Sequence, residues 1–262
     1  MLEVKHLTKV FHKGTPNEMT LFDDFSLQVK PGEFITMIGS NGAGKSTLLN
    51  LIAGDLMVDS GRINFCEEDL TPLQGFKRSK IVSRVFQSPD LGINPNMTIL
   101  ENLSMAYNKI KRNPFTKGVQ KNQIAIFKHY LQLCDLGLDE MIYKKVSLLS
   151  GGQKQALCLI MAIINKPKIL LLDEHTAALD PKTAHKILEI TNTIVAKYSI
   201  TTIMITHNMN DAIKYGNRLI MLDQGNIVLD LDEEAKNNVD SQQLIEYFKT
   251  RSNTLDDKLF LI

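Results

Sequence analysis

The apolar residues of this chain fall into short runs and longer amphipathic stretches. Largely apolar runs at 33–38, 81–86, 169–172 and 200–206 predict strands, and an unbroken run such as 169–172 is typical of a strand buried in a parallel sheet. Further strands are predicted at 2–4, 7–11, 21–29, 60–65, 218–222 and 227–229, the last two around a turn at 223–226. Strands alternating with helical segments predict an α/β fold.

Helical spacing dominates between about 98 and 166. Its apolar stripes are Leu100, Leu103 and Tyr107, and then Ile124, Phe127, Leu131 and Cys134. A basic stretch at 109–122 predicts a solvated loop within this block. The block interrupts the strand pattern, so we interpret it as a helical insertion whose faces are either core or a docking surface.

Two further helical segments follow. One spans 182–197, and the polar C-terminal part, 232–262, is predicted to be helical with Leu244, Ile245 and Phe248 as its apolar stripe. This last segment is too short to add a domain.

A glycine-rich segment joins the strand at 33–38 to a helix starting near Lys45 and ending at Gly54. Its residues are Gly39, Ser40, Asn41, Gly42, Ala43, Gly44, Lys45, Ser46 and Thr47. Strand, glycine turn and helix in this order predict a phosphate-binding P-loop, or Walker A motif, in which backbone N–H groups converge on the positive end of a helix dipole. A chance glycine turn is the weaker reading because the context matches on both sides.

The side chains at the end of this motif carry phosphate chemistry. Lys45 brings a charge to the β- and γ-phosphates, Ser46 offers a hydroxyl to Mg2+, and Thr47 can hold an α-phosphate oxygen.

A second helix start is predicted at Leu149, Ser150, Gly151, Gly152 and Gln153. Ser150 and Gln153 have the spacing of a capping box, and the helix runs on to a stop at Pro167. Two glycines destabilise a helix by about 1 kcal/mol each relative to alanine. Their presence therefore favours an uncovered anion-binding helix end over a purely structural cap.

Polar residues follow three of the predicted strands at their carboxyl ends, where ligands bind in open α/β sheets. Asp173 and Glu174 end the run at 169–172. Asp173 is placed to hold Mg2+, and Glu174 is placed to polarise an attacking water. Gln87 and His207 occupy equivalent positions after their own strands, so both can reach the same phosphate.

Phe11 is an aromatic residue at the end of an N-terminal strand. It is either part of the core or a flat surface on which a nucleobase stacks.

Composition narrows the class of protein. The chain has 262 residues and a net charge of +1, so nothing in its overall charge suggests nucleic-acid binding. The N-terminal residues show no signal-peptide pattern, and the longest apolar runs are too short to cross a bilayer. Cys66, Cys134 and Cys158 have no metal-like spacing and are expected to be reduced core thiols of a cytoplasmic protein.

Taken together, the ordered motifs resemble the ATP-binding subunit of ABC transporters over roughly residues 2–231. The resemblance rests on the P-loop at Gly39, on Gln87, on the Ser-Gly-Gly-Gln signature at 150–153, on Asp173-Glu174, and on Asp180 and His207. It implies a P-loop ATPase with a mainly parallel core sheet, an N-terminal antiparallel β layer, a helical subdomain at about 90–165, and a C-terminal extension at 232–262.

The resemblance also implies roles for these residues. ATP lies between the P-loop of one copy and the signature of a second, head-to-tail copy; Phe11 stacks on adenine and Asp180 belongs to a loop that crosses the dimer. Ser46, Gln87 and Asp173 serve Mg2+. Glu174 is the general base, His207 links the γ-phosphate to the attacking water, and Ser150 and Gly152 touch the γ-phosphate of the partner's ATP.

The implied partners are integral membrane permease subunits at the cytoplasmic face of the membrane, which dock on the helical insertion, and indirectly an extracytoplasmic substrate-binding protein.

Three positions depart from the family pattern, namely Ala156, His175 and Asn217, and none takes a direct part in the chemistry. The Asp-Glu-His-Thr form at 173–176 resembles bacterial importers suspected of carrying aromatic amino acids or related solutes. The alternatives are a soluble ABC ATPase, such as an iron–sulfur assembly ATPase, and a subunit that binds nucleotide without hydrolysing it.

Overall fold

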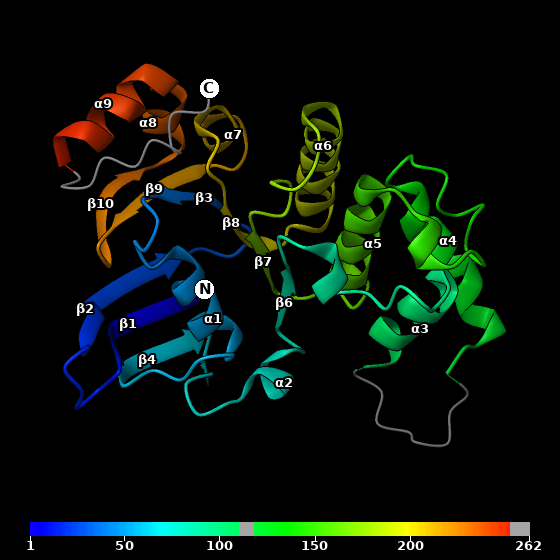
Figure 1. Ribbon diagram of the computed structural model, residues 1–262, viewed down its shortest axis with the longest axis horizontal. Helices are drawn as coiled ribbons and strands as arrows, with labels where there is room; N and C mark the ends of the chain where they lie inside the picture. The colour runs from blue at the N-terminus through cyan, green and yellow to red at the C-terminus, as the bar shows by residue number, and fades with distance from the viewer. Residues whose placement is uncertain (110–117, 252–262) are drawn as a thin grey trace.

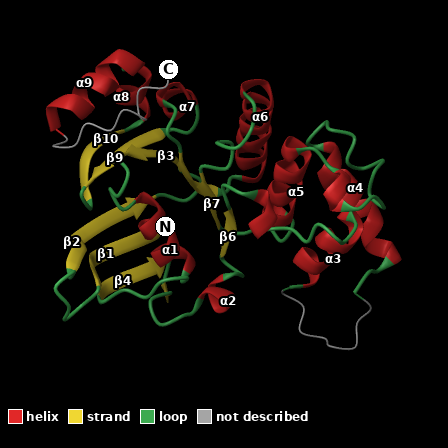
Figure 2. Ribbon diagram, in the orientation of Figure 1, coloured by secondary structure: helices red, strands yellow, loops and turns green. Residues whose placement is uncertain are grey.

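Two β-sheets and a block of helices make up the described part of the chain, residues 1–109 and 118–251 of a computed structural model (Figures 1 and 2). The two gaps bear on two predictions. Most of the predicted basic loop at 109–122, and the final residues of the predicted C-terminal extension, lie outside the described residues.

The larger sheet has six strands in the order β10-β9-β3-β8-β7-β6. Their bounds are β3 (Phe34–Gly39), β6 (Val82–Val85), β7 (Ile169–Asp173), β8 (Thr201–Ile205), β9 (Arg218–Asp223) and β10 (Asn226–Leu231). Neighbouring strands from β9 to β6 pair in parallel, and only β10 pairs antiparallel, through a tight turn at Gln224 and Gly225 with φ of 44° and 77°. The predicted mainly parallel core sheet is confirmed.

The smaller sheet is antiparallel, with four strands in the order β2-β1-β4-β5. Its strands are β1 (Leu2–Phe11), β2 (Met19–Val29), β4 (Ser60–Phe65) and β5 (Glu68–Asp69). The two segments predicted at 2–4 and 7–11 form one strand with an irregular register, and His6 at this irregularity has a φ of 51°. Helix α1 (Lys45–Ala53) packs its buried leucines into the core that this sheet shares with β3.

The helical block contains α3 (Ile99–Asn108), α4 (Ile124–Gln132) and α5 (Gly151–Ile163) and lies to one side of the two sheets (Figure 1). Leu100, Leu103, Phe127 and Leu131 are buried in one core with α5 and with α6 (Pro181–Tyr198). The predicted stripes are therefore core at these positions. Helix α5 ends earlier than predicted, at Ile163 rather than near Pro167.

The remaining helices are short. They are α2 (Gly75–Arg78), α7 (Met209–Lys214), α8 (Glu233–Asn237) and α9 (Ser241–Arg251), with 3-10 turns η1 (Pro89–Leu91), η2 (Lys121–Gln123) and η3 (Val146–Leu148). Leu244 of α9 is buried against α7 and β9, while Ile245 is half-buried in the same cluster. Lys236 of α8 is also buried; its Nζ donates to the carbonyls of Tyr215 and Gly216 and so fastens α8 to the end of α7.

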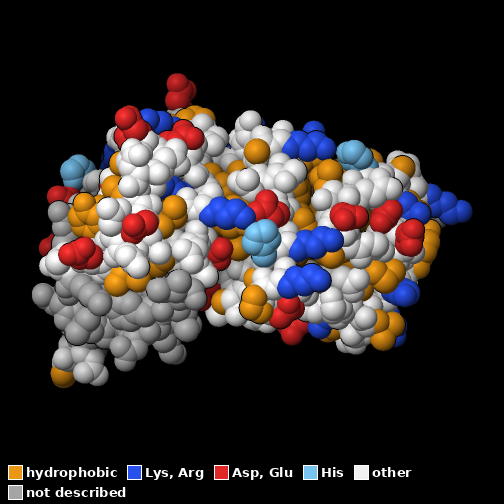
Figure 3. Space-filling model, turned by 90° about the horizontal axis from the view of Figure 1, so that it is seen from above, with side chains coloured by type: hydrophobic (Ala, Val, Ile, Leu, Met, Phe, Trp, Pro, Cys, Tyr) orange, Lys and Arg blue, Asp and Glu red, His pale blue; other side chains and the backbone are white. Residues whose placement is uncertain are grey.

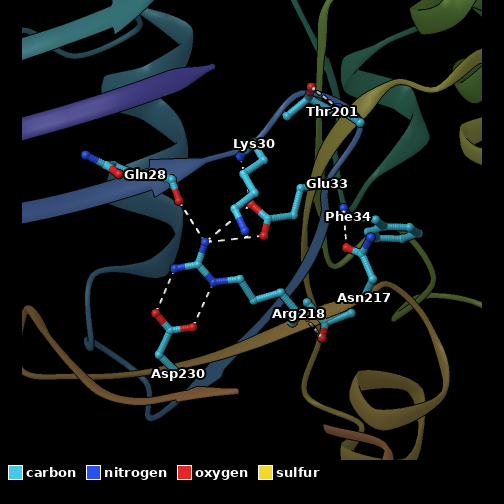
Figure 4. A network of polar contacts seen from close by, with 10 residues as sticks. Gln28, Lys30, Glu33, Phe34, Thr201, Asn217, Arg218 and Asp230 are labelled. Carbon is cyan, nitrogen blue, oxygen red and sulfur yellow. Dashed lines mark hydrogen bonds and ion pairs between the residues drawn. The ribbon is translucent and has the colours of Figure 1, made fainter. Parts of the chain in front are cut away.

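A polar network around Arg218 ties the two sheets together (Figure 4). The guanidinium of Arg218, in β9, donates to both carboxylate oxygens of Asp230 at 2.8 and 2.7 Å, and to the carbonyl of Gln28 in β2 at 2.8 Å. It also forms an ion pair with Glu33 at 3.3 Å, and the hydrogen bond with Asp230 raises the pKa of Arg218. Asn217, a departure from the family pattern, accepts a hydrogen bond from the Phe34 N–H at 2.9 Å.

All three cysteines are free, but one prediction about them is wrong. Cys134 and Cys158 are buried, and burial raises the pKa of each thiol to about 12. Cys66 is exposed instead, because it lies in the turn between β4 and β5 with a φ of 54°. Among the described residues, no helix is both long and apolar enough to span a bilayer.

Candidate active site

The predicted P-loop connects the end of β3 to the start of α1. Its residues Gly39, Ser40, Asn41, Gly42, Ala43 and Gly44 lead directly into Lys45, the first residue of the helix. Gly42 has a φ of 81°, a conformation that strongly favours glycine, and a Cβ built there would meet no atom within 4 Å. The backbone at Gly42 therefore faces open space rather than packed protein.

The loop is braced from within and from the neighbouring hairpin. Lys45 is 6% exposed, and its Nζ donates to the carbonyls of Gly39 at 2.7 Å and Ser40 at 2.8 Å. The Ser40 hydroxyl is 2.9 Å from Asp223 Oδ1 at the end of β9. The Gly225 N–H, in the β9–β10 turn, donates to the Ala43 carbonyl at 3.0 Å. These contacts brace the loop from both sides.

These features fit a phosphate chain. Among the described residues, no side chain caps the N-terminus of α1, whose first N–H groups have no acceptor within the helix. Their donors and the helix dipole favour an anion at this end. Ser46 is exposed and Thr47 half-buried in this first turn, next to the buried Lys45. The P-loop therefore has the shape, the donors and the charge that a nucleotide's phosphates require.

The residues expected to serve Mg2+ come from three elements. Ser46 Oγ lies 3.2 Å from Asp173 Oδ1, so the hydroxyl and the carboxylate face one another. Gln87 lies two residues past β6 and is exposed; β6 and β7 pair in parallel with Val85 opposite Leu172, which places Gln87 at the same edge of the sheet. In the described part of the chain, the hydrogen bonds of Ser46 and Asp173 go to one another and to Arg84, and not to the Gln87 side chain.

This donor set fits magnesium. Within residues 1–109 and 118–251 there is no group of three or more His, Cys, Asp or Glu side chains arranged to hold a metal. Mg2+ in nucleotide sites is held through one or two carboxylates together with substrate phosphates and waters, so one carboxylate and one hydroxyl beside a P-loop suffice.

Glu174 and His207 form the closest polar pair of the site. His207 Nε2 is 2.5 Å from Glu174 Oε1, and the Glu174 N–H donates to the Ile205 carbonyl across β7 and β8 at 3.2 Å. Glu174 has a φ of 47°, so the chain turns sharply just after β7. The hydrogen bond from His207 lowers the pKa of Glu174, helped by the charge of Lys45 and opposed by burial.

The predicted capping box is confirmed at the start of α5. Ser150 Oγ accepts from the Gln153 N–H at 3.3 Å, and Gln153 Oε1 accepts from the Ser150 N–H at 3.1 Å. Gly151 is exposed, but Gly152 is buried, and a Cβ at Gly152 would lie 2.3 Å from Thr183 Cγ2. The use of glycine at 152 therefore has a packing cause in addition to any anion-binding role.

The signature and the P-loop lie in different parts of the molecule. Ser150, Gly152 and Gln153 line a hollow with residues of α6, including Lys182 and Lys186, and no P-loop residue lines it. Helix α1 packs into one core and α5 into another, and Figure 1 shows the two helices apart. Basic side chains and a histidine gather near the middle of the face seen from above, where α6 reaches the surface (Figure 3).

Two predicted site residues lie on the periphery. Phe11 is the last residue of β1, is half-exposed, and belongs to none of the three hydrophobic core clusters found among the described residues. Lys9 Nζ lies 5.6 Å from the centre of the Phe11 ring. Asp180 is exposed and caps α6, its carboxylate accepting from the Thr183 N–H at 3.1 Å. Hydrogen bonding to the Thr183 side chain, and then to its backbone N–H, lowers the pKa of Asp180.

Two contacts at the site were not anticipated from the sequence. Asp223 braces Ser40, as described above, and Arg84 donates to Asp173 Oδ2 at 2.6 Å. The sequence holds a signal for Arg84, since it is a charged residue within the apolar strand run 81–86. The sequence predicts only a turn at Asp223, and nothing in its local sequence indicates a contact with Ser40.

Comparison with known proteins agrees with this geometry. Residues 22–177 match the family described as "ABC transporter". The chain is 47% identical to a tyrosine transport ATP-binding protein of Clostridioides difficile (strain R20291), over 95% of this chain and 99% of that protein. It is 35% identical to the spermidine/putrescine import ATP-binding protein PotA of Mannheimia succiniciproducens, over 88% of this chain but only 57% of that longer protein.

Solved structures with a similar fold are also ATP-binding cassettes. The fold matches a dimeric post-hydrolysis state of the ATP-binding cassette MJ0796 bound to ADP and Pi, with a TM-score of 0.76 and 27% identity over 89% of this chain and 99% of that chain. It also matches the ADP conformation of MJ1267, an ATP-binding cassette of an ABC transporter, with a TM-score of 0.77 and 28% identity over 95% of this chain and 98% of that chain.

Proposed function

This chain belongs to the ABC transporter family and is an ATPase of that type, and from this premise we propose that it drives a solute importer whose cargo is an aromatic amino acid or a related small solute. The Glu174–His207 pair, at the sheet edge that also holds Asp173 and the P-loop, carries the ATPase part of the proposal, and the 47% identity to a tyrosine transport ATP-binding protein supports the cargo. This arrangement has a nucleotide cradle, a metal-facing carboxylate and a base, so it supports hydrolysis rather than nucleotide binding alone.

In the proposed ATP complex, the backbone from Gly39 to Thr47 surrounds the phosphates and Lys45 turns its ammonium from the loop carbonyls towards them. Phe11, which is half-exposed at the end of strand β1 in the smaller sheet, stacks on adenine. Ser46 and Asp173 hold Mg2+, with Gln87 reaching it from the loop after β6. Bound magnesium neutralises charge that develops on the phosphates during transfer.

For hydrolysis, Glu174 accepts a proton from the attacking water. The lowered pKa of Glu174 keeps its carboxylate ionised at neutral pH, which is the state a general base needs. His207 positions that carboxylate through Nε2 and extends towards the γ-phosphate. The short contact between them orients both groups before substrate arrives.

The active form is proposed to be a head-to-tail pair of copies. The signature hollow contains no P-loop residue, so one chain cannot place both anion-binding helix ends on one phosphate chain. In the pair, Ser150, Gly151, Gly152 and Gln153 of one copy face the ATP on the P-loop of the other, and Asp180 lies in the loop between them. The dimeric state of the similar cassette MJ0796 supports this arrangement.

Membrane permease subunits are proposed to dock in a cleft between the sheets and the helical block. The cleft has a volume of about 500 Å3 and is lined by residues from the end of α1, from β6 and from α3 and α5. Phe76, Leu91 and Met105, three apolar side chains of the elements that border it, are 50–71% exposed, as expected of a surface that packs against a partner. Gln87, just past β6, joins this region to the nucleotide site.

This docking would place the chain at the cytoplasmic face of a membrane, with a substrate-binding protein reached only through the permease. We propose residues 1–231 as the ATPase domain, about 90–165 as its helical subdomain, and 232–262 as an extension. The packing of α3, α4 and α5 around one core supports the subdomain, and this core also takes in α6 and strands of the larger sheet.

The cargo is tested by uptake. Deleting the gene should abolish uptake of labelled tyrosine but leave uptake of labelled putrescine intact. A plasmid carrying the wild-type chain should restore tyrosine uptake, while Glu174→Gln should not. Loss of putrescine uptake instead would reject the aromatic cargo, and unchanged uptake of both would reject these solutes altogether.

The soluble alternative is less favoured. Both kinds of relative compared above are named as transport or import ATP-binding proteins, whereas an iron–sulfur assembly ATPase would be expected to bind scaffold proteins only. Recovery of a multi-spanning membrane protein with the tagged chain from solubilised membranes supports the importer, and recovery of soluble partners alone rejects it.

A further inference from the structure

Arg84 joins the proposed metal carboxylate to the docking cleft. It lies in β6, with its side chain 12% exposed, and its Nη2 donates to Asp173 Oδ2 at 2.6 Å. Its other terminal nitrogen, Nη1, donates to Asn50 Oδ1 and to Asp55 Oδ2, the latter at 3.2 Å. The guanidinium also stands 4.7 Å from the centre of the Phe86 ring. One side chain thus contacts α1, the segment after α1, and the end of β7.

The two oxygens of Asp173 are divided between two partners. Oδ2 accepts from Arg84 and Oδ1 faces Ser46 Oγ at 3.2 Å. A charge-assisted bond to one oxygen, with the Ser46 contact on the other, restrains rotation of the carboxylate. With Oδ2 held, Oδ1 is the oxygen directed at the hydroxyl expected to serve the metal.

We propose that Arg84 is a positioning residue that orients Asp173 for Mg2+ through its fork of donors. This inference rests on the magnesium role proposed for Asp173. In this proposal Arg84 does not contact the metal but holds Asp173, which does. Asn50 and Asp55 accept hydrogen bonds from Arg84 and so hold it in place. Hydrogen-bond partners of this kind are typically worth a factor of 10–100 in metal affinity.

The positioning role requires the forked shape of the Arg84 guanidinium and not only its positive charge. Arg84 reaches three acceptors on three elements because its terminal nitrogens diverge in one plane, which a lysine ammonium cannot reproduce. A positive charge also repels a cation, so a role of charge alone would weaken metal binding. Arg84→Lys keeps the charge and removes the fork, and therefore separates the two effects.

The arrangement has a consequence for the cleft. Arg84, Asp55 and Phe86 all line it, so the group that orients the metal carboxylate is also part of the proposed docking surface. Asp55 accepts a hydrogen bond from Arg84, which also holds Asp173. A partner that contacts Asp55 would therefore act on the same side chain that orients Asp173.

The test measures metal binding without turnover. Mn2+ stands in for Mg2+, and free Mn2+ is followed by electron paramagnetic resonance during titration of the protein saturated with a non-hydrolysable ATP analogue. The variants are Arg84→Lys, Arg84→Gln and Asp173→Asn, with Arg62→Lys on the exposed face of β4 as the matched control. Nucleotide affinity without metal is measured in parallel in a chelator.

We expect Arg84→Lys and Arg84→Gln each to weaken Mn2+ binding about tenfold or more. Nucleotide affinity in chelator should stay within about twofold of wild type, and Arg62→Lys should change neither quantity. If both Arg84 variants bind Mn2+ as tightly as wild type or more tightly, while Asp173→Asn binds it more weakly, the positioning role of Arg84 is rejected. The magnesium role of Asp173 is then kept.

Two other outcomes are decisive. If Asp173→Asn also binds Mn2+ normally, the magnesium role of Asp173 fails and the inference fails with it. If the Arg84 variants lose nucleotide affinity in chelator, Arg84 acts on the P-loop through α1 rather than on Asp173, and the proposal is rejected.

Discussion

His207 Nε2 lies 2.5 Å from Glu174 Oε1, while Nδ1 of the same ring is buried without a hydrogen-bond partner in the described structure. The ring therefore makes its one strong polar contact with the carboxylate. That contact is the largest cause of the lowered pKa of Glu174. Glu174 is the base and His207 orients it. A variant of Glu174 should therefore lower the rate, whereas a variant of His207 should shift the pH dependence of the rate.

Replacing Glu174 by Gln should reduce kcat about 10²- to 10⁴-fold while leaving ATP affinity nearly unchanged, because the amide keeps the shape but cannot accept the proton. With ATP present, light scattering should show the variant as a dimer at concentrations where wild type is mostly monomeric. Glu234→Gln, at an exposed carboxylate of α8, is the control and should keep its rate. A Glu174→Gln variant with normal turnover would remove Glu174 from the mechanism.

His207→Ala should move the acid limb of the kcat profile to higher pH. Since the hydrogen bond from His207 lowers the pKa of Glu174, its removal lets that pKa rise, and the active carboxylate is lost at a less acidic pH. Steady-state rates across pH 4.5–8 at saturating ATP measure the shift. His129→Ala, on the exposed face of α4, should leave the profile in place. An acid limb that stays at its wild-type position would mean that His207 does not tune Glu174.

Gly152→Ala should destabilise the protein by about 1–3 kcal/mol, because the new methyl group would lie 2.3 Å from Thr183 Cγ2 and force α5 and α6 apart. Thr183→Ser removes that methyl, so the double variant should regain most of the loss. Gly151→Ala, with its nearest neighbour 3.4 Å away, is the matched control and should change stability little. Urea unfolding measures all four; a double variant as unstable as Gly152→Ala would rule out the clash.

Lys236 should make stability depend on pH above neutrality. Burial lowers its pKa to about 8 from the ordinary value of 10.5. Between these values the unfolded chain binds a proton that the folded chain does not, so the unfolding free energy rises with pH through this window. Lys236→Met should lack this rise, and Lys128→Met, on the exposed face of α4, should keep it. Urea titrations at pH 7.5 and 10 test it: parallel changes in wild type and Lys236→Met would show that the buried amine does not titrate in this range.

Much of the fold could be predicted because its signals are local. The run at 169–172 becomes β7, the turn at 223–226 becomes the β9–β10 hairpin, and Ser150 with Gln153 forms the predicted capping box. Each depends on residues within a few positions of one another. Pairing order across the sheet and the length of α5 depend on distant contacts, and α5 ends several residues before the predicted stop at Pro167.

The candidate site was predictable to the same extent. Side chains that follow parallel strands must meet at one edge, so Asp173, Glu174 and His207 could be grouped from the sequence. Contacts between distant segments could not: Thr183 explains the glycine at 152, and Asp223 braces Ser40 across 183 positions. The exposure of Cys66 could not be predicted because the strand at 60–65 gives no sign of the exposed turn that follows it.

The separation of the P-loop from the signature hollow has a genetic consequence. In a head-to-tail pair, a copy defective at Lys45 and a copy defective at Ser150 place both lesions in the same composite site, which leaves the other site with an intact P-loop and an intact signature. Two inactive alleles expressed together should therefore complement one another in part. Two different P-loop alleles should not, since each site would then contain one lesion.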